Sequence, residues 1–277
     1  MGGNNSKINE LIKKAEDEGW AHCIVTKADE YALTKGYTFS WDRANAAIDY
    51  IEKFLVLPKS NGQKPFKLLK WQKEKLFQPL FGWVRPDGTR RFRKGYVEIP
   101  KKNGKTATAS AIAIYMLDGD GEPGAEVYNC ANDRNQAKIV FKMVQDIVNH
   151  SKYLSHLKIT ESTSTITRDP QSWLQSWSGD ASAKDGPNIY MAICDELHEW
   201  KAQGEKLFGI IKWGGAIRRE PLCPFSITTA GTADEQGLCL DQHNYAMSIL
   251  DGTIYKDLAF FPLIFRVYVF CFPQHFL

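Results

Sequence analysis

Several features are missing from this 277-residue sequence, and each absence excludes a class of protein. The six cysteines form no C-x-x-C pair and no regular framework, so we expect reduced, mostly buried thiols and not a disulfide-linked domain. The amino terminus has no apolar stretch after a basic start, and no secretory signal is predicted. The one long apolar run, residues 258–272, is interrupted by Pro262 and Arg266 and is shorter than the roughly 20 residues that a membrane-spanning helix needs. These absences predict a cytoplasmic chain without a membrane span.

Acidic residues are scarce in one segment of the chain. Residues 60–105 contain 13 Lys or Arg residues but only three acidic ones, although the net charge of the whole chain is +3. Two interpretations fit this segment: a solvated surface with chance clustering, or attraction to a polyanion such as nucleotide phosphates or a nucleic-acid backbone. Hydrophobic residues at 43% and charged residues at 24% are typical of a globular protein and exclude bulk disorder.

The pattern of apolar residues predicts an α/β fold. Residues 7–58 show helical spacing and end in a turn-rich stretch, which favours a helical segment over 1–58. A helix around 70–81 and a hairpin turn at 85–88 follow. From about residue 94, strand-like runs alternate with amphipathic helical runs, and this alternation predicts a mainly parallel sheet covered by helices on both faces. We assign residues 59–255 to this domain and residues 256–277 to an atypical apolar tail outside it.

Residues 99–110, IPKKNGKTATAS, end like a phosphate-binding loop. The pattern G-x-x-x-x-G-K-[ST] requires a first glycine where this chain has Ile99. The loop nevertheless follows a predicted strand and opens a predicted helix, so backbone N–H groups can converge on phosphate oxygens. In this interpretation Lys105 reaches the β- and γ-phosphates and the hydroxyl of Thr106 coordinates Mg²⁺; the alternative is a chance GKT. The residues expected around the phosphates are Lys101, Lys102, Asn103, Gly104, Lys105 and Thr106.

A second candidate element is YMAICDE, residues 190–196. Four apolar residues form a predicted buried strand that delivers Asp195 and Glu196 at its carboxyl end, where open α/β sheets bind ligands. Asp195 can hold Mg²⁺ through water, and Glu196 can orient and activate an attacking water. The alternative is an ordinary strand end with solvated acids. Two half-motifs at separate strand ends, about 90 residues apart, argue against that alternative.

Two weaker elements complete the candidate site. The strand SITTAGT, residues 226–232, ends in Thr228 and Thr229, whose hydroxyls could bond the γ-phosphate or its water. Upstream, Gln72 follows Trp71, and a Gln amide offers both a donor and an acceptor to an adenine edge. Taken singly, these patterns are also those of a routine strand end and of surface packing.

In this order, KWQ, EIPKKNGKT, AICDELHEW and ITTAGT resemble the large terminase subunit of tailed bacteriophages. Members of that family carry a deviant loop, P-R-K-N-G-K-[ST], without a leading glycine. The resemblance covers roughly residues 35–255 and includes NCANDRNQAKIVF and SWSGDASAKDGPN. It implies a P-loop NTPase of the RecA-like type, with ATP and Mg²⁺ as cofactors, that translocates double-stranded DNA into procapsids. The implied partners are DNA, the portal protein, the small terminase subunit and further copies in a homo-oligomeric ring, in the cytoplasm of the bacterial host.

The resemblance also implies a role for each matched residue. The implied roles are Lys105 and Thr106 as the end of Walker A, Asp195 as the Walker B magnesium residue, Glu196 as the catalytic carboxylate, Thr228 and Thr229 as the coupling motif, and Gln72 as the adenine-binding residue. Where the family usually has Arg in the loop, this chain has Lys101, which keeps the charge but loses the planar, bidentate fork. Arg218 and Arg219 are candidates for an arginine finger supplied to a neighbouring subunit, with a solvated pair after a helix as the alternative.

The end of the sequence departs from the family. Large terminases carry a second, RNase H-like nuclease domain with clustered carboxylates, whereas the last acidic residue of this chain is Asp257. We therefore expect an isolated or truncated motor domain without endonuclease activity, with residues 256–277 left from the linker. Two other functions stay open. One is a helicase of the DEAD/DEAH type, suggested by DELH, which would need a second RecA-like domain; the other is a non-hydrolysing remnant that serves DNA binding or assembly.

Overall fold

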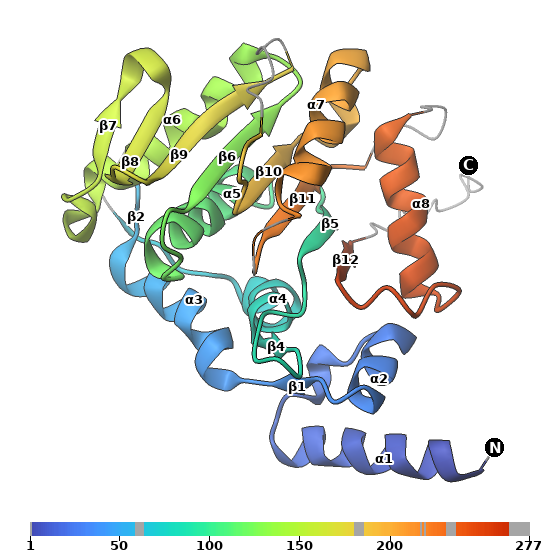
Figure 1. Cartoon of the computed structure of the whole chain (residues 1–277). Coiled ribbons are helices and arrows are strands. Elements are labelled where there is room, and N and C mark those ends of the chain that lie inside the picture. Colours follow the sequence, from blue (N-terminus) through green and yellow to red (C-terminus); the bar gives the residue numbers. More distant parts are fainter. Residues whose placement is uncertain are drawn as a thin grey trace, which may run out of the picture.

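The centre of the molecule is a large, mainly parallel sheet. The structure is a computed structural model that describes residues 2–58, 64–179, 186–216, 218, 220–230 and 237–265, and within these residues the sheet has eight strands in the order β12-β5-β11-β10-β6-β9-β8-β7 (Figure 1). Six strands run parallel: β5 (Lys94–Glu98), β6 (Glu126–Ala131), β9 (Ser172–Ser178), β10 (Met191–Asp195), β11 (Leu222–Thr228) and β12 (Phe260–Ile264). The other two, β7 (Lys158–Thr160) and β8 (Thr165–Asp169), form an antiparallel hairpin at one edge.

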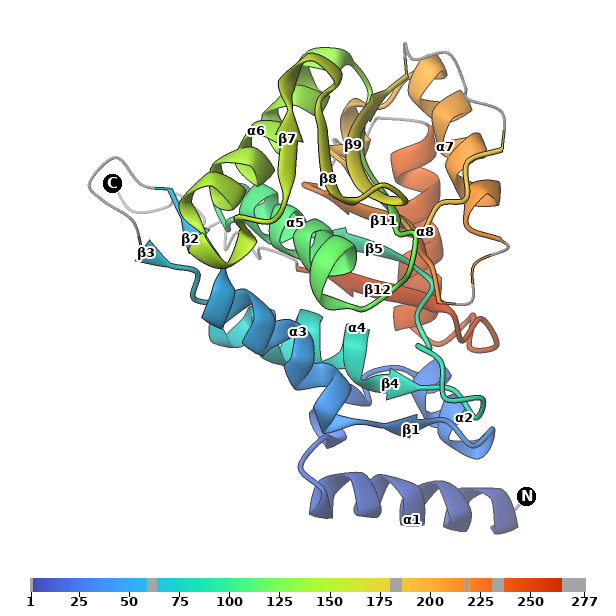
Figure 2. The ribbon, with the colours of Figure 1, turned by 60° about the vertical axis from the view of Figure 1, so that its left-hand side comes forward.

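Helices cover both faces of this sheet, as the strand–helix alternation predicts (Figure 2). The four long helices of this layer are α5 (Lys105–Ile114), α6 (Arg134–His150), α7 (Ala202–Gly214) and α8 (Leu238–Leu250). On one face, Ile112 of α5 and Val144 of α6 share an apolar cluster with Ile193 of β10. On the other, Leu207 of α7 and Ala246 of α8 join a second cluster. All residues of β10 and β11 are buried, as expected for central strands of a sheet that is covered on both faces.

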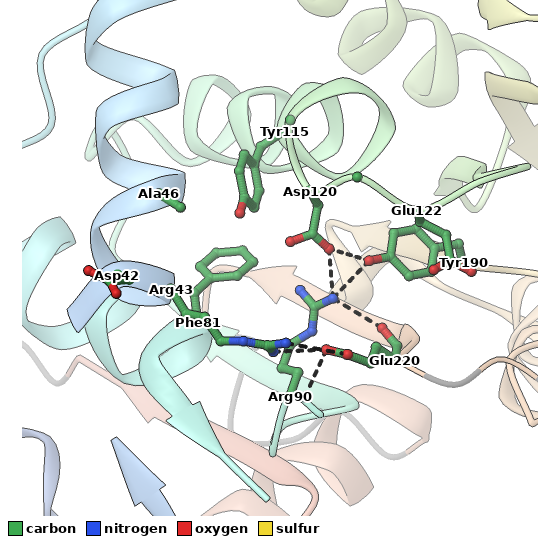
Figure 3. Close-up of a pocket in the computed structure, with 12 residues that line it drawn as sticks. Asp42, Arg43, Ala46, Phe81, Arg90, Tyr115, Asp120, Glu122, Tyr190 and Glu220 are labelled. Atoms are coloured by element: carbon green, nitrogen blue, oxygen red, sulfur yellow. Dashed lines mark hydrogen bonds and ion pairs between the residues drawn. The ribbon is translucent and has the colours of Figure 1, made fainter. Parts of the chain in front are cut away.

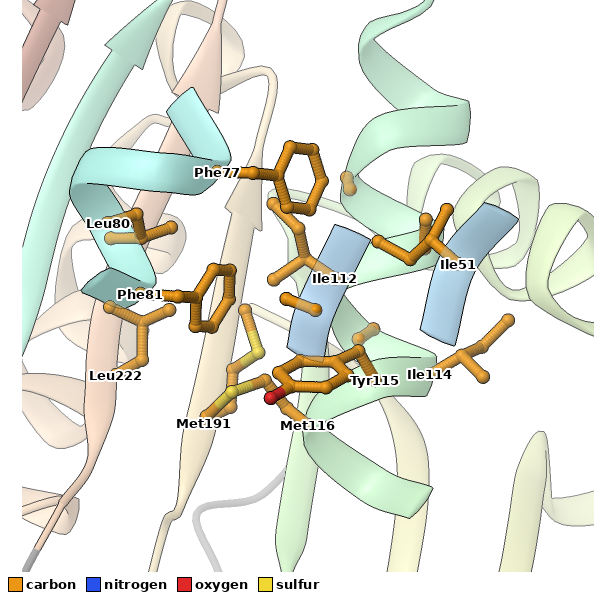
Figure 4. Packing of buried hydrophobic residues seen from close by; sticks show 14 of the residues in the cluster. Ile51, Phe77, Leu80, Phe81, Ile112, Ile114, Tyr115, Met116, Met191 and Leu222 are labelled. Carbon is orange, nitrogen blue, oxygen red and sulfur yellow. The ribbon is translucent and has the colours of Figure 1, made fainter. Parts of the chain in front are cut away.

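The amino-terminal segment is helical but has no core separate from that of the sheet. Its helices are α1 (Gly2–Asp17), α2 (Lys27–Thr34) and α3 (Trp41–Phe54), with a 3₁₀ turn at Ala21–Cys23. Ile51 of α3 packs with Phe81 and Tyr115 and with Met191 of the central sheet in one cluster (Figure 4). The expected boundary at residue 58 also falls inside a small sheet, because β2 (Val56–Leu57) pairs with β3 (Lys64–Pro65). Residues 1–58 are therefore not an independent unit.

Short elements connect this segment to the sheet. The helix expected around 70–81 is a π-helical turn, Gln72–Phe77, continued by α4 (Gln78–Gly82). The hairpin expected at 85–88 is present, because Val84 bridges to Arg90 across this turn. In addition, β4 (Trp83–Val84) pairs with β1 (Thr38–Phe39). The remaining turns are a π-helical turn at Tyr115–Gly119 and 3₁₀ turns at Lys152–Leu154, Glu161–Thr163 and Leu197–Glu199.

The carboxyl-terminal boundary predicted at residue 256 is wrong. Strand β12 pairs in parallel with β5 along its whole length, and the N–H of Phe265 donates to the carbonyl of Glu98 at 3.0 Å. Pro262 lies within this strand, and a residue without an N–H fits an edge strand. The described part of the apolar tail therefore belongs to the central sheet, because its apolar side chains complete the core beside β5. Residues 266–277 lie outside the described part. No helix among the described residues is both long and apolar enough to cross a bilayer.

Candidate active site

The GKT loop connects β5 to α5 at the carboxyl edge of the sheet. Gly104 is the residue before α5 and has a φ of 74°, a left-handed conformation that glycine adopts without strain. The side-chain amide of Asn103 donates to the carbonyl oxygens of Pro100 and Lys101, at 3.1 and 3.3 Å, and so closes the turn on itself. Residues 101–104 are exposed, so the loop presents its backbone N–H groups and the helix amino terminus outward.

Ile99 stands where the first glycine of the phosphate-loop pattern would be. Its side chain is 1% exposed, and its N–H donates to the carbonyl of Thr228 at 3.0 Å. Ile99 thus continues β5 alongside β11 and packs in the core. The deviant position belongs to the strand and not to the loop, so the missing glycine does not alter the turn at 101–104.

Lys105 connects this loop to the acidic pair after β10. Its side chain is 8% exposed, its Nζ forms an ion pair with Oε2 of Glu196, and it lies 4.0 Å from Oδ1 of Asp195. Glu196 has a φ of 49°, and its N–H donates to the carbonyl of Ile227 at 3.1 Å, so the main chain turns sharply where β10 ends. The two half-motifs predicted from the sequence therefore meet at one edge of the sheet, and their charged groups are in contact.

Burial is the main influence on the pKa of Asp195. The side chain is 9% exposed, and burial together with the neighbouring charge of Glu196 raises the pKa of Asp195 to about 6, although Lys105 opposes the change. A nearby cation stabilises the charged form of such a buried carboxyl group. Thr106 lies in the first turn of α5 and is half-buried. The roles of Asp195 and Thr106 as oxygen ligands of Mg²⁺ stay a prediction. Among the described residues no cluster of three or more His, Cys, Asp or Glu side chains could hold a metal by itself, and nucleotide phosphates would have to complete the coordination.

Thr228 and Thr229, the predicted coupling motif, lie between these two elements. Strand β11 separates β5 from β10, and it ends in Thr228, whose hydroxyl donates to the carbonyl of Thr229 at 3.0 Å. The hydroxyl of Thr229 is buried and has no hydrogen-bond partner among the described residues. His198 also contacts Thr228, with its Nδ1 at 3.0 Å from the hydroxyl oxygen. The sequence motif assigned roles to the Asp and Glu of DELHEW but none to this histidine.

Gln72 lies against the phosphate loop. It is 4% exposed; its Oε1 accepts from the N–H of Leu69 at 2.8 Å, and its Nε2 donates to the hydroxyl of Thr108 at 2.9 Å. Thr108 in turn donates to the carbonyl of Gly104 at 3.0 Å. These bonds connect the segment before the sheet to the start of α5. One N–H and one lone pair of the Gln72 amide remain for other partners. Contact of these groups with adenine stays a prediction.

The structure gives Arg218 another role than the predicted arginine finger. Its guanidinium donates to the carbonyls of Asn188 and Gly124 and pairs with Glu122 at 3.0 Å, and the side chain is 12% exposed. These acceptors lie at the amino ends of the strands, on the edge opposite the GKT loop. Arg218 is thus held within its own chain and is not free for a neighbour's nucleotide. Arg219 lies outside the described residues.

The basic segment at 60–105 is not one positive face. Arg90 and Arg91 are 3% and 1% exposed, and Arg91 pairs with Asp29 at 2.7 Å. Lys105 belongs to the candidate site just described. Buried and paired cations explain part of the clustering, so the excess of basic residues is not evidence for a DNA-binding surface.

A polar cavity of about 460 Å³ lies at the opposite edge of the sheet (Figure 3). Arg90 pairs with Asp120 at 2.8 Å and donates to the hydroxyl of Tyr190 at 2.9 Å, while Arg43 pairs with Glu220 at 3.0 Å. Burial alone would raise the pKa of Asp120, but Arg90 and the hydrogen bonds of Tyr190 hold the pKa below its ordinary value. Because these charges neutralise one another, we assign the cavity to a network that ties α3 to the sheet and not to the nucleotide.

Comparison with protein families identifies the family of the domain that carries this site. The family model described as terminase large subunit, ATPase domain, matches residues 70–248, which include every described residue of the candidate site from Gln72 to Thr229. The chain belongs to this family. Membership implies an NTPase domain that binds ATP, and it confirms the resemblance drawn from the motifs.

The fold agrees with that of a solved large terminase. The crystal structure of the HK97 bacteriophage large terminase matches 81% of this chain with a TM-score of 0.67 and 22% sequence identity, and the match spans 44% of that protein. The large terminase ATPase domain of Thermus phage P74-26 matches 63% of this chain, and 76% of its own, with a TM-score of 0.44 and 15% identity. No curated protein matches the sequence.

Proposed function

We propose that this terminase ATPase domain hydrolyses ATP to power the translocation of double-stranded viral DNA. The observation that carries the proposal is the meeting of Lys105 with Asp195 and Glu196 at one edge of the sheet. A cation beside two carboxylates at the ends of parallel strands, next to the exposed amino terminus of α5, is the arrangement that phosphoryl transfer requires. The family and the fold of the HK97 large terminase support the same conclusion.

Each group of the site has a definite task in hydrolysis. Backbone N–H groups of residues 103–106 bind phosphate oxygens, and Lys105 exchanges its carboxylate partner for the β- and γ-phosphates. Glu196, released from Lys105, then accepts a proton from the water that attacks the γ-phosphate. Mg²⁺, held by Asp195 and Thr106, would neutralise the charge that develops on the phosphates. The ion pair between Lys105 and Glu196 therefore keeps the base inactive until a nucleotide takes the lysine.

Partners of the motor follow from the family and not from a surface of this structure. Double-stranded DNA is the expected track, and the portal protein, the small terminase subunit and further copies of this chain in a ring are the proposed partners. An arginine from a neighbouring subunit would have to be a residue other than Arg218, whose guanidinium is held by Asn188, Gly124 and Glu122.

A separation of binding from turnover tests the proposal. The variant Glu196→Gln keeps the shape of the side chain but cannot accept the proton, so we expect it to bind ATP and to lose turnover. Binding is measured with a fluorescent ATP analogue and turnover by phosphate release, and the matched control is Glu16→Gln, an exposed change in α1. Full turnover in Glu196→Gln would exclude this residue as the base, and a wild-type protein that binds no ATP would exclude the proposed function.

A further inference from the structure

The imidazole of His198 lies between the candidate base and the coupling strand. His198 is in the 3₁₀ turn Leu197–Glu199, directly after Glu196, and its side chain is 15% exposed. Its Nδ1 is 3.0 Å from the hydroxyl oxygen of Thr228 and 3.3 Å from Oε2 of Glu196. Its Nε2 is 3.3 Å from Oε1 of Glu199. One ring nitrogen therefore faces both Glu196 and Thr228.

The hydrogen bonds around Thr228 bear on whether Nδ1 of His198 donates or accepts. The hydroxyl of Thr228 uses its one hydrogen to donate to the carbonyl of Thr229 at 3.0 Å. It can then only accept from His198, whose backbone N–H also approaches the same oxygen at 3.4 Å. In this arrangement the Nδ1 of His198 is the donor, and its hydrogen is shared between the hydroxyl of Thr228 and the carboxylate of Glu196. Glu199 lies at the other ring nitrogen.

The elements around His198 connect this contact to the phosphate loop and to α8. Oε2 of Glu196 has two cationic or donor neighbours, Lys105 and His198. When nucleotide phosphates draw Lys105 away, the Nδ1–H of His198 is the donor that stays beside the carboxylate. The carbonyl of Thr228 also accepts from Ile99, before the phosphate loop, and α8 packs against the turn that carries His198. A shift of His198 thus reaches the phosphate loop and α8 through direct contacts.

We propose that His198 is a positioning residue that holds Glu196 for attack and transmits the state of this carboxylate to the coupling residue Thr228. The inference rests on the proposed ATPase function and adds a residue that the motif left without a role. His198 itself touches neither nucleotide nor water. It acts by sharing one N–H between two acceptors, so a change in the position of one acceptor alters the bond to the other.

Nitrogen NMR of the imidazole tests the contact without any turnover. In the nucleotide-free chain, with the His198 signals assigned by their loss in His198→Gln, we expect a protonated Nδ1 whose signal shifts in Thr228→Val and in Glu196→Gln. Addition of Mg²⁺ with a non-hydrolysable ATP analogue should shift the same signal in the wild type. A signal that neither substitution moves, or an Nε2-protonated tautomer without an Nδ1 proton, would overturn the inference.

Kinetics test the positioning role. We expect His198→Ala to lower kcat about 10-fold while the KM for ATP changes little, because the hydrogen bonds that are lost act on Glu196 and Thr228 and not on bound ATP. His198→Asn, whose amide N–H can replace the Nδ1–H, should recover part of the rate. The double variant His198→Ala with Thr228→Val should be no slower than the worse single variant. His156→Ala, in an exposed histidine far from the site, is the control.

The two proposals fail in different ways. Additive losses in the double variant, or an unchanged kcat in His198→Ala, would refute the positioning role while leaving the ATPase intact. A wild type without turnover would refute the proposed function, and the NMR of the nucleotide-free chain would still decide whether His198 connects Glu196 to Thr228.

Discussion

Replacement of Asp195 by asparagine should stabilise the nucleotide-free protein and abolish its activity at the same time. The carboxyl group of Asp195 is buried at the end of β10, and burial raises its pKa from 3.8 to about 6. A carboxyl whose pKa is raised on folding binds its proton more tightly in the folded state, so stability is lost as pH rises from about 4 through about 6. At about 1.4 kcal/mol per pH unit, this loss reaches about 3 kcal/mol at pH 8.

Asparagine has nearly the same shape and carries no charge, so Asp195→Asn removes this cost. We expect the free energy of unfolding in urea to rise by up to about 3 kcal/mol at pH 8 and by less than about 1 kcal/mol at pH 4, where the wild-type group is protonated in the folded chain. The exposed change Glu16→Gln serves as control at both pH values. Equal stability of Asp195→Asn and the wild type at pH 8, or the same gain at both pH values, would refute the argument that the charged carboxylate is strained by burial.

Two further substitutions test the phosphate-binding loop and the contacts of Arg218. Gly104→Ala places a side chain at a φ of 74°, so unfolding in urea should show a loss of about 1–2 kcal/mol together with weaker binding of fluorescent ATP; unchanged stability would mean that the loop can take another conformation. Arg218→Ala should lower stability by about 1–3 kcal/mol because its bonds to Asn188, Gly124 and Glu122 are lost, while ATP turnover per folded molecule stays the same. Loss of turnover in a fully folded Arg218→Ala would instead restore its role as the arginine finger.

Much of the fold was predictable because its signals are local. Strands β6 and β10 are short, mostly apolar stretches, and α6 has an apolar stripe after the capping residue Asp133. The edge strand β12 was missed because an apolar run near the end of a sequence carries no information about its partner. Only the pairing with β5 shows that Phe260–Ile264 completes the sheet.

The site was predictable where chemistry lies within a motif and not where it depends on neighbouring strands. GKT and DE each contain the charged residues that meet in the structure, and parallel strands necessarily bring their carboxyl ends to one edge. His198 was not assigned, since its contact with Thr228 exists only because β10 and β11 are adjacent. The same holds for Arg218, whose acceptors at Gly124 and Asn188 are distant in sequence.

We propose that the meeting of Lys105 with Glu196 marks the hydrolytic centre of a DNA motor. The most direct test is steady-state ATP hydrolysis by the purified chain with and without double-stranded DNA, with Lys105→Ala as the test variant and the exposed Lys13→Ala as its control. We predict turnover in the wild type that DNA stimulates, the same behaviour in Lys13→Ala, and none in Lys105→Ala. Turnover that survives the loss of Lys105, or that is absent from the wild type under both conditions, would contradict the account.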